Sequence, residues 1–208
     1  KSRVENEKRN LEAYSVELDN LRKAKDQLLK TTQNDEAKYQ EELEKARAEL
    51  EAIEAIVSTV NFKNGTEVDR GDVIAVMGNS GAPYCSDGAH LHFEVRKNGV
   101  IQNAEKYLKS QSMYVEDFDS GTKSIGSGKW IWPMKSPQVT QRYGSTPWSR
   151  RYPSGRHDGI DMISNNTFIY APEDGKMVRG GMGCYGAVIN YVAIDHGGGV
   201  VSYYLHVK

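Results

Sequence analysis

The stretch HLHFEVRKNG, residues 90–99, has the alternation of a β-strand that runs into a turn. Successive side chains of a strand point to opposite faces, so Leu91, Phe93 and Val95 share one face while His90 and His92 share the other. The apolar face predicts a buried core, and the histidine face predicts a polar or functional surface. By itself, such a pair indicates either a metal or catalytic site or two solvated, hydrogen-bonded imidazoles.

Similar short runs fill residues 58–208 and are bounded by turns that contain glycine, as in GDVIAVMG (71–78), HDGIDMI (157–163) and AVINYVAIDHGGG (187–199). Many short strands with regular turn signals predict a mainly antiparallel β domain. Its length of roughly 150 residues is enough to bury a core of its own. Residues 110–128 are rich in Ser, Gly and Asp and predict a linker. The GSGK at residues 126–129 lacks the glycine spacing, and the Ser or Thr after Lys, of a phosphate-binding loop.

Residues 1–57 differ from the rest, because they contain no Gly or Pro and are dense in Glu, Lys, Arg, Ala and Leu. Apolar or long side chains recur there at spacings of three and four, which predicts a long α-helix with the heptad pattern of a coiled coil. The pattern is interrupted at residues 30–38 (KTTQNDEAK), either by a slipped register or by the tip of a helical hairpin. A third alternative is a lone helix whose apolar stripe packs on its own domain. The recurring residues are Leu11, Tyr14, Leu18, Leu21, Leu28, Tyr39, Leu43, Ala46, Leu50, Ile53 and Val57.

The overall composition narrows the classes of partner. The 27 Lys and Arg residues against 28 Asp and Glu residues give a formal net charge of −1, which gives no support to nucleic acid or an acidic membrane as a partner. No apolar run is long enough to span a bilayer, and no signal peptide begins at Lys1. The two cysteines, Cys85 and Cys184, are too few for a tetrathiolate zinc site and are either free thiols or one disulfide.

A second cluster of ligand-type side chains lies in GRHDGIDM, residues 155–162. His157 and Asp161 are four residues apart, but Gly159 and Ile160 disfavour a helix, so the motif predicts a turn that enters a strand. An imidazole and a carboxylate are acceptable zinc ligands, although such pairs also form plain hydrogen bonds.

The two remaining histidines lie in different settings. In SYYLHV, residues 202–207, alternation places Tyr204 and His206 on one face of a predicted strand. His196 precedes three glycines at the end of another strand, which predicts a structural residue that bonds to the backbone of a turn.

GRHDGIDM, YYLH and GAHLHFEVRKNG together resemble the signatures of the lysostaphin/LytM-type zinc endopeptidases, which cut peptide cross-links in bacterial peptidoglycan. The flanking stretches IWPMKSPQVTQRYG, APEDGKMV and VDRGDVIAVMGNSG are similar to that family as well. The resemblance covers about residues 58–108 and 129–208, and it implies a mainly antiparallel LytM-type β domain with a groove, here attached to the long helical segment.

The resemblance implies that His92, His157 and Asp161 bind one Zn²⁺ ion and that His90 and His206 are catalytic residues beside it. Three protein ligands leave a tetrahedral zinc with one position for water. The metal would lower the pKa of that water and polarise the scissile carbonyl. The two histidines would take a proton from the water, pass one to the leaving amine or stabilise the oxyanion.

The order of the motifs departs from that of the family, in which the His-x-His motif comes last. We therefore expect a circularly permuted domain, with residues 58–109 as its C-terminal half, 129–208 as its N-terminal half and 110–128 joining the usual ends. One alternative is that this order is not the order of synthesis, and another is a swap of halves between two copies. Peptide mapping across Val57–Ser58 separates the first two, because a spanning peptide requires this order in the protein.

The resemblance also bears on the cysteines and on the place of action. In the resembling fold, the loops that carry Cys85 and Cys184 rim the cleft. An extracytoplasmic setting, whether periplasm, cell wall or secreted, would favour a disulfide between them that stiffens the site.

Substrate contacts are expected from the loop STPWSRRYPSG, residues 145–155, where the candidates to hold a peptide stem are Trp148, Arg150, Arg151 and Tyr152. A solvated loop without contacts is the alternative. Tyr204 is a further candidate for lining the site, against a role in core packing.

Two classes of function compete at this stage. The first is an active cell-wall endopeptidase whose substrate is a peptidoglycan peptide. The second is a non-catalytic or inhibited module that activates or recruits another cell-wall hydrolase through its coiled coil. The complete ligand set favours the enzyme. Residues 1–57 would then engage a coiled-coil or membrane-complex partner, restrain the domain, or serve as a dimerisation rod or spacer.

Overall fold

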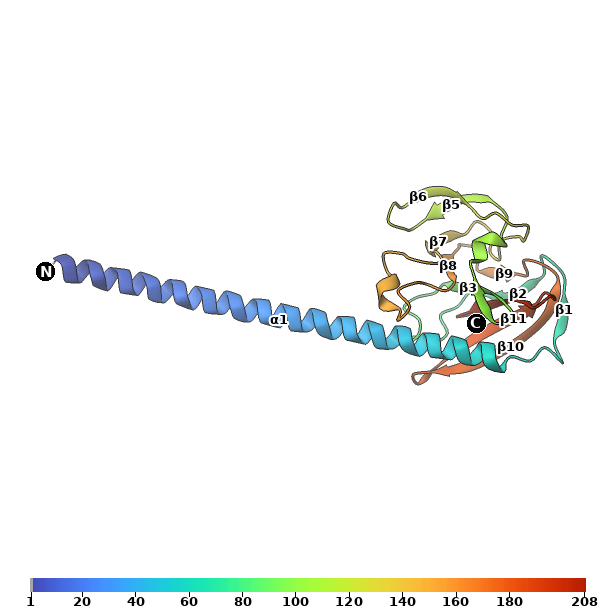
Figure 1. Cartoon of the computed structure of the whole chain (residues 1–208), viewed down its shortest axis with the longest axis horizontal. Helices are drawn as coiled ribbons and strands as arrows, with labels where there is room; N and C mark the ends of the chain where they lie inside the picture. The colour runs from blue at the N-terminus through green and yellow to red at the C-terminus, as the bar shows by residue number, and fades with distance from the viewer. Residues whose placement is uncertain (1) are drawn as a thin grey trace. The chain divides into compact units, whose positions relative to one another are not determined.

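The computed structural model describes the backbone of residues 2–208, with side chains described at Val16 and from Leu18 onward. It begins with one long helix, α1 (Ser2–Thr59), which continues without a break through residues 30–38 (Figure 1). The helical hairpin is therefore not formed. The coiled coil, which needs a second helix, stays a prediction, and Leu11 and Tyr14 of its heptad pattern lie outside the described side chains.

The rest of the described chain is mainly β-sheet, as the sequence predicts. The larger sheet follows the order β1-β10-β11-β12-β3-β8-β7-β5-β6, with β4 paired to β3, and β2 and β9 form a second, two-stranded sheet. All pairs are antiparallel except β5 with β7. The strands are β1 (Thr66–Val68), β2 (Val73–Val76), β3 (Leu91–Lys97), β4 (Val100–Gln102), β5 (Gln111–Val115), β6 (Gly121–Ile125), β7 (Gln138–Gln141), β8 (Ile160–Ile163), β9 (Phe168–Tyr170), β10 (Gly175–Cys184), β11 (Ala187–Asp195) and β12 (Val200–Leu205), with short 3₁₀ turns η1 (Ala104–Lys106) and η2 (Ser149–Arg151).

Strand β3 lies in the middle of the larger sheet and buries both of its faces. Leu91, Phe93 and Val95 are fully buried in the main hydrophobic core, as the alternation predicts. His92 and Glu94 on the opposite face are buried as well. The polar face of the strand is therefore enclosed within the protein rather than exposed to solvent.

The C-terminal part of α1 belongs to the compact β-rich unit, which spans residues 43–208, while residues 1–42 form a separate unit. Ile53 and Ile56 of the helix are buried in a second apolar cluster, together with Ile189 of β11 and Leu205 of β12. The domain boundary expected after residue 57 thus falls earlier, because the last turns of the helix bury their apolar stripe on the sheet. For this part of α1, the alternative of a helix packed on its own domain is the one observed.

The predicted linker, residues 110–128, forms the β5–β6 hairpin at one edge of the sheet (Figure 1). Met113 and Val115 are buried there while Tyr114 between them is exposed, which is the alternation of a strand with one face on the core. Its many Ser and Gly residues obscure this pattern in the sequence. The segment connects residues 58–109 to 129–208, and both of these contribute strands to the same sheet.

The circular permutation stays a prediction, because the same arrangement in space is compatible with more than one order of the chain.

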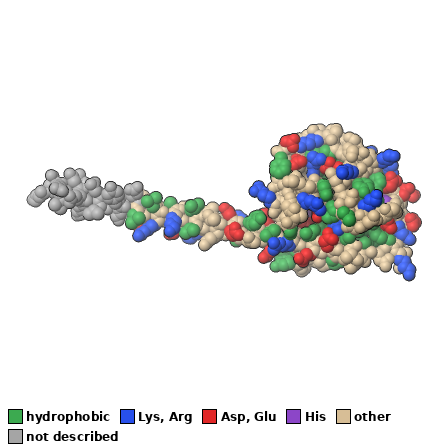
Figure 2. Space-filling model, viewed as in Figure 1, with side chains coloured by type: hydrophobic (Ala, Val, Ile, Leu, Met, Phe, Trp, Pro, Cys, Tyr) green, Lys and Arg blue, Asp and Glu red, His purple; other side chains and the backbone are tan. Residues whose placement is uncertain are grey.

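On the viewed face of the β-rich unit, basic and acidic side chains are interspersed (Figure 2). Within the residues that the structure describes, no helix combines the length and the apolar character needed to cross a bilayer.

Replacing Ile56 by Ala is expected to lower the free energy of unfolding by about 2–5 kcal/mol, because a fully buried side chain is lost from the contact between helix and sheet. Urea denaturation followed by circular dichroism measures the change. Val188→Ala, at an exposed position of β11, is the control and should shift the free energy by less than about 0.5 kcal/mol. Equal effects of the two substitutions would contradict the packing of α1 on the sheet.

Candidate metal centre

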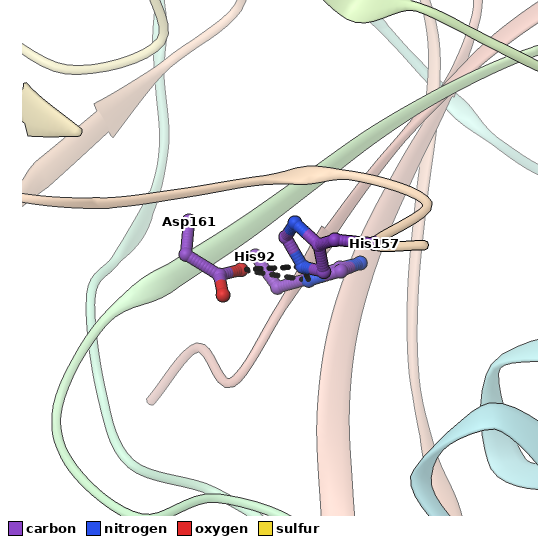
Figure 3. Close-up of side chains that lie close together, drawn as sticks. All are labelled: His92, His157 and Asp161. Carbon is purple, nitrogen blue, oxygen red and sulfur yellow. Dashed lines mark hydrogen bonds and ion pairs between the residues drawn. The ribbon is translucent and has the colours of Figure 1, made fainter. Parts of the chain in front are cut away.

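The register of the sheet places the predicted ligands side by side. In the antiparallel pair β3–β8, His92 is directly opposite Asp161. Such cross-strand neighbours have Cβ atoms about 5 Å apart, so their side chains meet on the same face. His157 lies in the loop before β8 and is held by a backbone bridge to Gly144. Two motifs far apart in the sequence therefore converge at one point (Figure 3).

Three ligand atoms form a tight triangle. The Nδ1 atom of His92 lies 2.8 Å from Oδ1 of Asp161 and 3.1 Å from Nε2 of His157. The third side, from Nε2 of His157 to Oδ1 of Asp161, is 3.3 Å. Both histidines are almost fully buried. Hydrogen bonds and ion pairs join these groups in Figure 3.

This triangle fits a tetrahedral zinc ion. Bonds of about 2.0–2.1 Å from zinc to its nitrogen and oxygen ligands require neighbouring ligand atoms about 3.3 Å apart. The longest side of the triangle has that length and the others are within about half an ångström of it. Two imidazoles and one carboxylate are also a donor set that zinc enzymes use, with the fourth position left for water or substrate.

Gly159 allows the close approach of the two motifs. A Cβ atom at this position would lie 2.7 Å from Nε2 of His92 and 2.9 Å from the backbone oxygen of Phe93. Real Cβ contacts are not that short, so a residue with a side chain in place of Gly159 would push the loop away from β3. The glycine is therefore required by packing against the ring of His92.

Two more histidines flank the triangle. The Nε2 atom of His90 lies 3.9 Å from Oδ1 of Asp161, and the rings of His90 and His206 are 4.6 Å apart. Nδ1 of His90 donates a hydrogen bond to the backbone oxygen of Gly88, and Nδ1 of His206 donates to that of Ser80. Because a carbonyl oxygen only accepts, these bonds keep a proton on Nδ1 of each ring. Nε2 of His90 is then left to accept a proton, whereas Nε2 of His206 faces the carboxylate of Glu49.

The electrostatics of the site favour an ionised carboxylate at Asp161 and a neutral ring at His90. Burial disfavours the charged form of Asp161, but the charges and hydrogen bonds of His157 and His92 outweigh it and hold the pKa of this carboxyl well below its usual value. Burial lowers the pKa of His90, which favours its neutral form. A neutral imidazole is the form that accepts a proton.

A residue of α1 reaches the site. Oε1 of Glu49 lies 3.1 Å from Nε2 of His206, which is completely buried. Glu49 and Ile53 of the helix line a pocket together with His92, His157 and Tyr152. The ring of Tyr152 is 5.5 Å from that of His157. The sequence gives no signal for Glu49, because nothing in a heptad pattern singles out one glutamate among many.

Glu94 and Arg96 continue the histidine face of β3 and were not among the predicted site residues. Oε1 of Glu94 lies 3.2 Å from Nε2 of His92, and Nε of Arg96 donates to Oε2 of Glu94 at 2.8 Å. The alternation that pairs His90 with His92 extends to both residues, so this signal was available in the sequence. A second group from the helix, Glu54, accepts a hydrogen bond of 2.8 Å from Arg96.

Tyr204 does not line the site. Its ring is fully buried in the main core against that of Phe93, at 5.3 Å, and its hydroxyl is hydrogen-bonded to Ser202. The predicted common face with His206 is wrong because β12 ends at Leu205 and His206 has a φ of 63°, in the left-handed region. The backbone therefore turns the His206 ring away from the face that Tyr204 occupies.

In the loop at residues 145–155, Tyr152 and Ser154 line the pocket, while Trp148 and Arg150 are not among the lining residues. His196 lies apart from the centre. Its Nδ1 donates to the backbone oxygen of Asp174, and its Nε2 lies 2.8 Å from the Ser202 hydroxyl, so both ring nitrogens are engaged.

Cys85 and Cys184 are joined in a disulfide. Both sulfurs belong to the apolar cluster that receives Ile53 and Ile56 of α1. The bond therefore ties the loop before β3 to the end of β10, on the side of the sheet that the helix covers.

Comparison with known proteins found a match over part of the chain. Residues 44–104 match the model of peptidase family M23. The matched segment contains His90 and His92, and it supports the resemblance to LytM-type metallopeptidases drawn from the motifs. His157, Asp161 and His206 lie outside the matched segment and reach it through the sheet. The searches of curated proteins and of solved structures found no match.

Replacing His157 by Ala is expected to lower the affinity for Zn²⁺ by more than about 100-fold. Loss of a group that is hydrogen-bonded to a metal ligand lowers metal affinity by about 10–100-fold, and loss of the ligand itself should lower it further. Competition with a chelator of known affinity measures the change. The control is His196→Ala, which removes a histidine outside the triangle and should leave zinc affinity unchanged. Equal zinc binding by the wild type and His157→Ala would rule out this ligand set.

Proposed function

We propose that this protein is a zinc-dependent endopeptidase that hydrolyses peptide cross-links of bacterial peptidoglycan. The observation that carries the proposal is the triangle of the two buried histidines His92 and His157 with Asp161, with two further histidines beside it. The match to peptidase family M23 supports metallopeptidase activity and a cell-wall peptide as substrate.

His92, His157 and Asp161 would hold one zinc ion through the three atoms that already face one another. When bound there, zinc would acidify a water molecule and polarise the scissile carbonyl. The low pKa of Asp161 keeps its carboxylate charged, which suits a ligand. The hydrogen bond of 3.0 Å from Nδ1 of His157 to the backbone oxygen of Arg142 fixes which nitrogen of that ring faces the centre.

His90 and His206 are the proposed proton carriers. Each holds its Nδ1 proton in a backbone hydrogen bond and directs the other nitrogen towards a polar partner, Asp161 for His90 and Glu49 for His206. One ring can take the proton of the attacking water and return a proton to the leaving amine. The protonated ring beside it can stabilise the oxyanion that forms on the scissile carbonyl.

The place of action that we propose is outside the cytoplasm. The disulfide between Cys85 and Cys184 supports this location, because disulfides persist in oxidising compartments and are rare in reducing ones. A peptidoglycan substrate requires the same location.

Replacing either His90 or His206 by Ala is expected to lower the cleavage rate of purified muropeptides by about 10²–10⁴-fold while the protein keeps its zinc. Mass spectrometry of the products and metal analysis of the same samples measure both properties. Exposed Tyr114→Ala on β5 is the control and should keep both. A zinc-loaded wild type that cleaves no muropeptide would contradict the proposed activity.

A restrained form of the same site is a second candidate, because the end of α1 is packed beside it. Glu49 is bonded to His206, the proposed proton carrier, and Ile53 lines the same pocket. The charge and hydrogen bond of His206 keep the Glu49 carboxyl ionised in spite of its burial, so its pKa is lowered. A substrate peptide that needs His206 would have to displace this carboxylate.

The remainder of α1 supports a role in recruitment. Leu18, Leu21 and Leu28 of the separate unit at residues 1–42 are exposed, and they follow the predicted heptad pattern. Exposed leucines at this spacing fit a partner helix. Docking of such a partner could release the restraint or bring the domain to another cell-wall hydrolase.

Glu49→Lys is expected to raise the rate of muropeptide cleavage by about tenfold or more. The substitution removes the contact between the Glu49 carboxylate and Nε2 of His206 and sets a positive charge against a fully buried ring, which favours release of the helix from the site. Glu51→Lys is the matched control, since the same charge change falls on an exposed position of the same helix. If Glu49→Lys cleaves no faster than Glu51→Lys with zinc bound in both, α1 does not restrain the enzyme.

A further inference from the structure

We propose that Glu94, held in place by Arg96, is a positioning residue that fixes the ring of His92 with Nδ1 towards the metal. The inference rests on the zinc centre proposed above and adds a group to it. Glu94 does not belong to the triangle of ligand atoms, and its contact is with the far nitrogen of the His92 ring.

A comparison of the four histidines at the site leads to this role. His90, His157 and His206 each donate Nδ1–H to a backbone oxygen, at 2.7, 3.0 and 2.8 Å, and thereby direct Nε2 inward. His92 has the opposite orientation, because its Nδ1 faces Asp161 and His157. Its outward nitrogen, Nε2, meets a carboxylate instead of a backbone oxygen, and that carboxylate belongs to Glu94.

Arg96 pairs with Glu94. The Glu94 side chain is completely buried, and the guanidinium of Arg96 beside it, which is always charged, is its partner of opposite charge. Arg96 engages Oε2 at 2.8 Å and leaves Oε1 for His92. An ionised carboxylate only accepts hydrogen bonds, so the Nε2 of His92 must donate. In neutral His92 the lone pair is then on Nδ1, the atom that faces the other two ligands.

The geometry excludes Glu94 as a fourth ligand in this arrangement. The two ring nitrogens of one imidazole point away from each other, so a group bonded to Nε2 cannot share an ion with Nδ1. If Glu94 served only to pair with Arg96, its contact with Nε2 of His92 would have no function. A carboxylate on the outer nitrogen of a ligand histidine fixes the tautomer and the ring orientation, and its loss typically costs about 10–100-fold in metal affinity.

Glu94→Gln tests the role with little change of shape. Arg96 only donates, so it takes the single amide oxygen of the new side chain, and the amide NH₂ then faces Nε2 of His92. Because NH₂ donates, neutral His92 must accept at Nε2 and carry its proton on Nδ1, where it competes with the metal. We expect zinc affinity to fall about 10–100-fold relative to the wild type. Competition of Zn²⁺ alone with a chelator measures this in the full-length protein.

The matched control is Glu67→Gln, the same chemical change on an exposed side chain of β1, and it should bind zinc as the wild type does. Arg96→Lys keeps the positive charge but loses the contact of the guanidinium with Oε2, and it should give a smaller loss of affinity. Backbone amide spectra and thermal unfolding establish that each variant is folded.

A readout on the wild type keeps the proposal testable even where Glu94→Gln fails to fold. In the zinc-loaded wild type, ¹⁵N-resolved NMR of the histidine rings should show the proton of His92 on Nε2, protected from exchange by Glu94. An Nε2 proton of His92 that exchanges freely with water, or equal zinc affinity of folded Glu94→Gln and the wild type, overturns the positioning role and leaves the zinc endopeptidase standing. A wild type that binds no zinc overturns the proposed function and this inference together.

Discussion

The antiparallel pairing of β3 with β8 on one side and β12 on the other is the constraint on which the site depends. It sets His92 opposite Asp161 and opposite Leu205, one residue before His206. A shift of one residue in either pairing would turn the side chains of that strand to the other face. The apolar face of β3 prevents such a shift, because Leu91, Phe93 and Val95 would have to leave the core. Packing of the hydrophobic face thus determines the geometry of the polar face.

The polar groups on the other face of β3 are buried too, and the free-energy cost of burying them has to be offset by pairing. His92, Glu94 and Arg96 are all buried, and a buried charge is costly unless it is paired and hydrogen-bonded. The chain meets this requirement with a continuous series of contacts, from Asp161 through His92 and Glu94 to Arg96. Every member has a partner of opposite charge or suitable hydrogen-bonding character. The same series orients the proposed ligand, so stability and function rest on the same contacts.

The C-terminal end of α1 contributes both to the apolar packing on the sheet and to the polar contacts of the site. Ile53 and Ile56 cover apolar residues of β11 and β12, and on the same helix Glu49 and Glu54 contact His206 and Arg96. The helix therefore cannot leave the sheet without exposing apolar surface and breaking two polar contacts near the centre. In this way the position of α1 is linked to the state of the site, and a partner that pulls on the helix would act on both.

Much of the fold and of the site follows from local patterns in the sequence. Alternation along residues 91–95 predicts the buried face of β3, and the HDGID motif predicts a turn that enters a strand. These patterns are local, because the two-residue period of a strand fixes which side chains share a face whatever lies next to it. The motifs also name His92, His157 and Asp161 as the candidate ligands.

What local patterns could not decide are contacts between segments far apart in the chain. The left-handed backbone at His206 separates it from Tyr204, and the hairpin at residues 110–128 is recognisable only once β7 lies beside it. Glu49 reaches His206 across 157 positions, and nothing in the helix sequence distinguishes it from neighbouring glutamates. The sequence by itself determined the long helix, the mainly antiparallel β class and the types of the candidate ligands. Only the tertiary structure decided which of these groups meet, because sheet register and helix docking depend on the packing of the whole core.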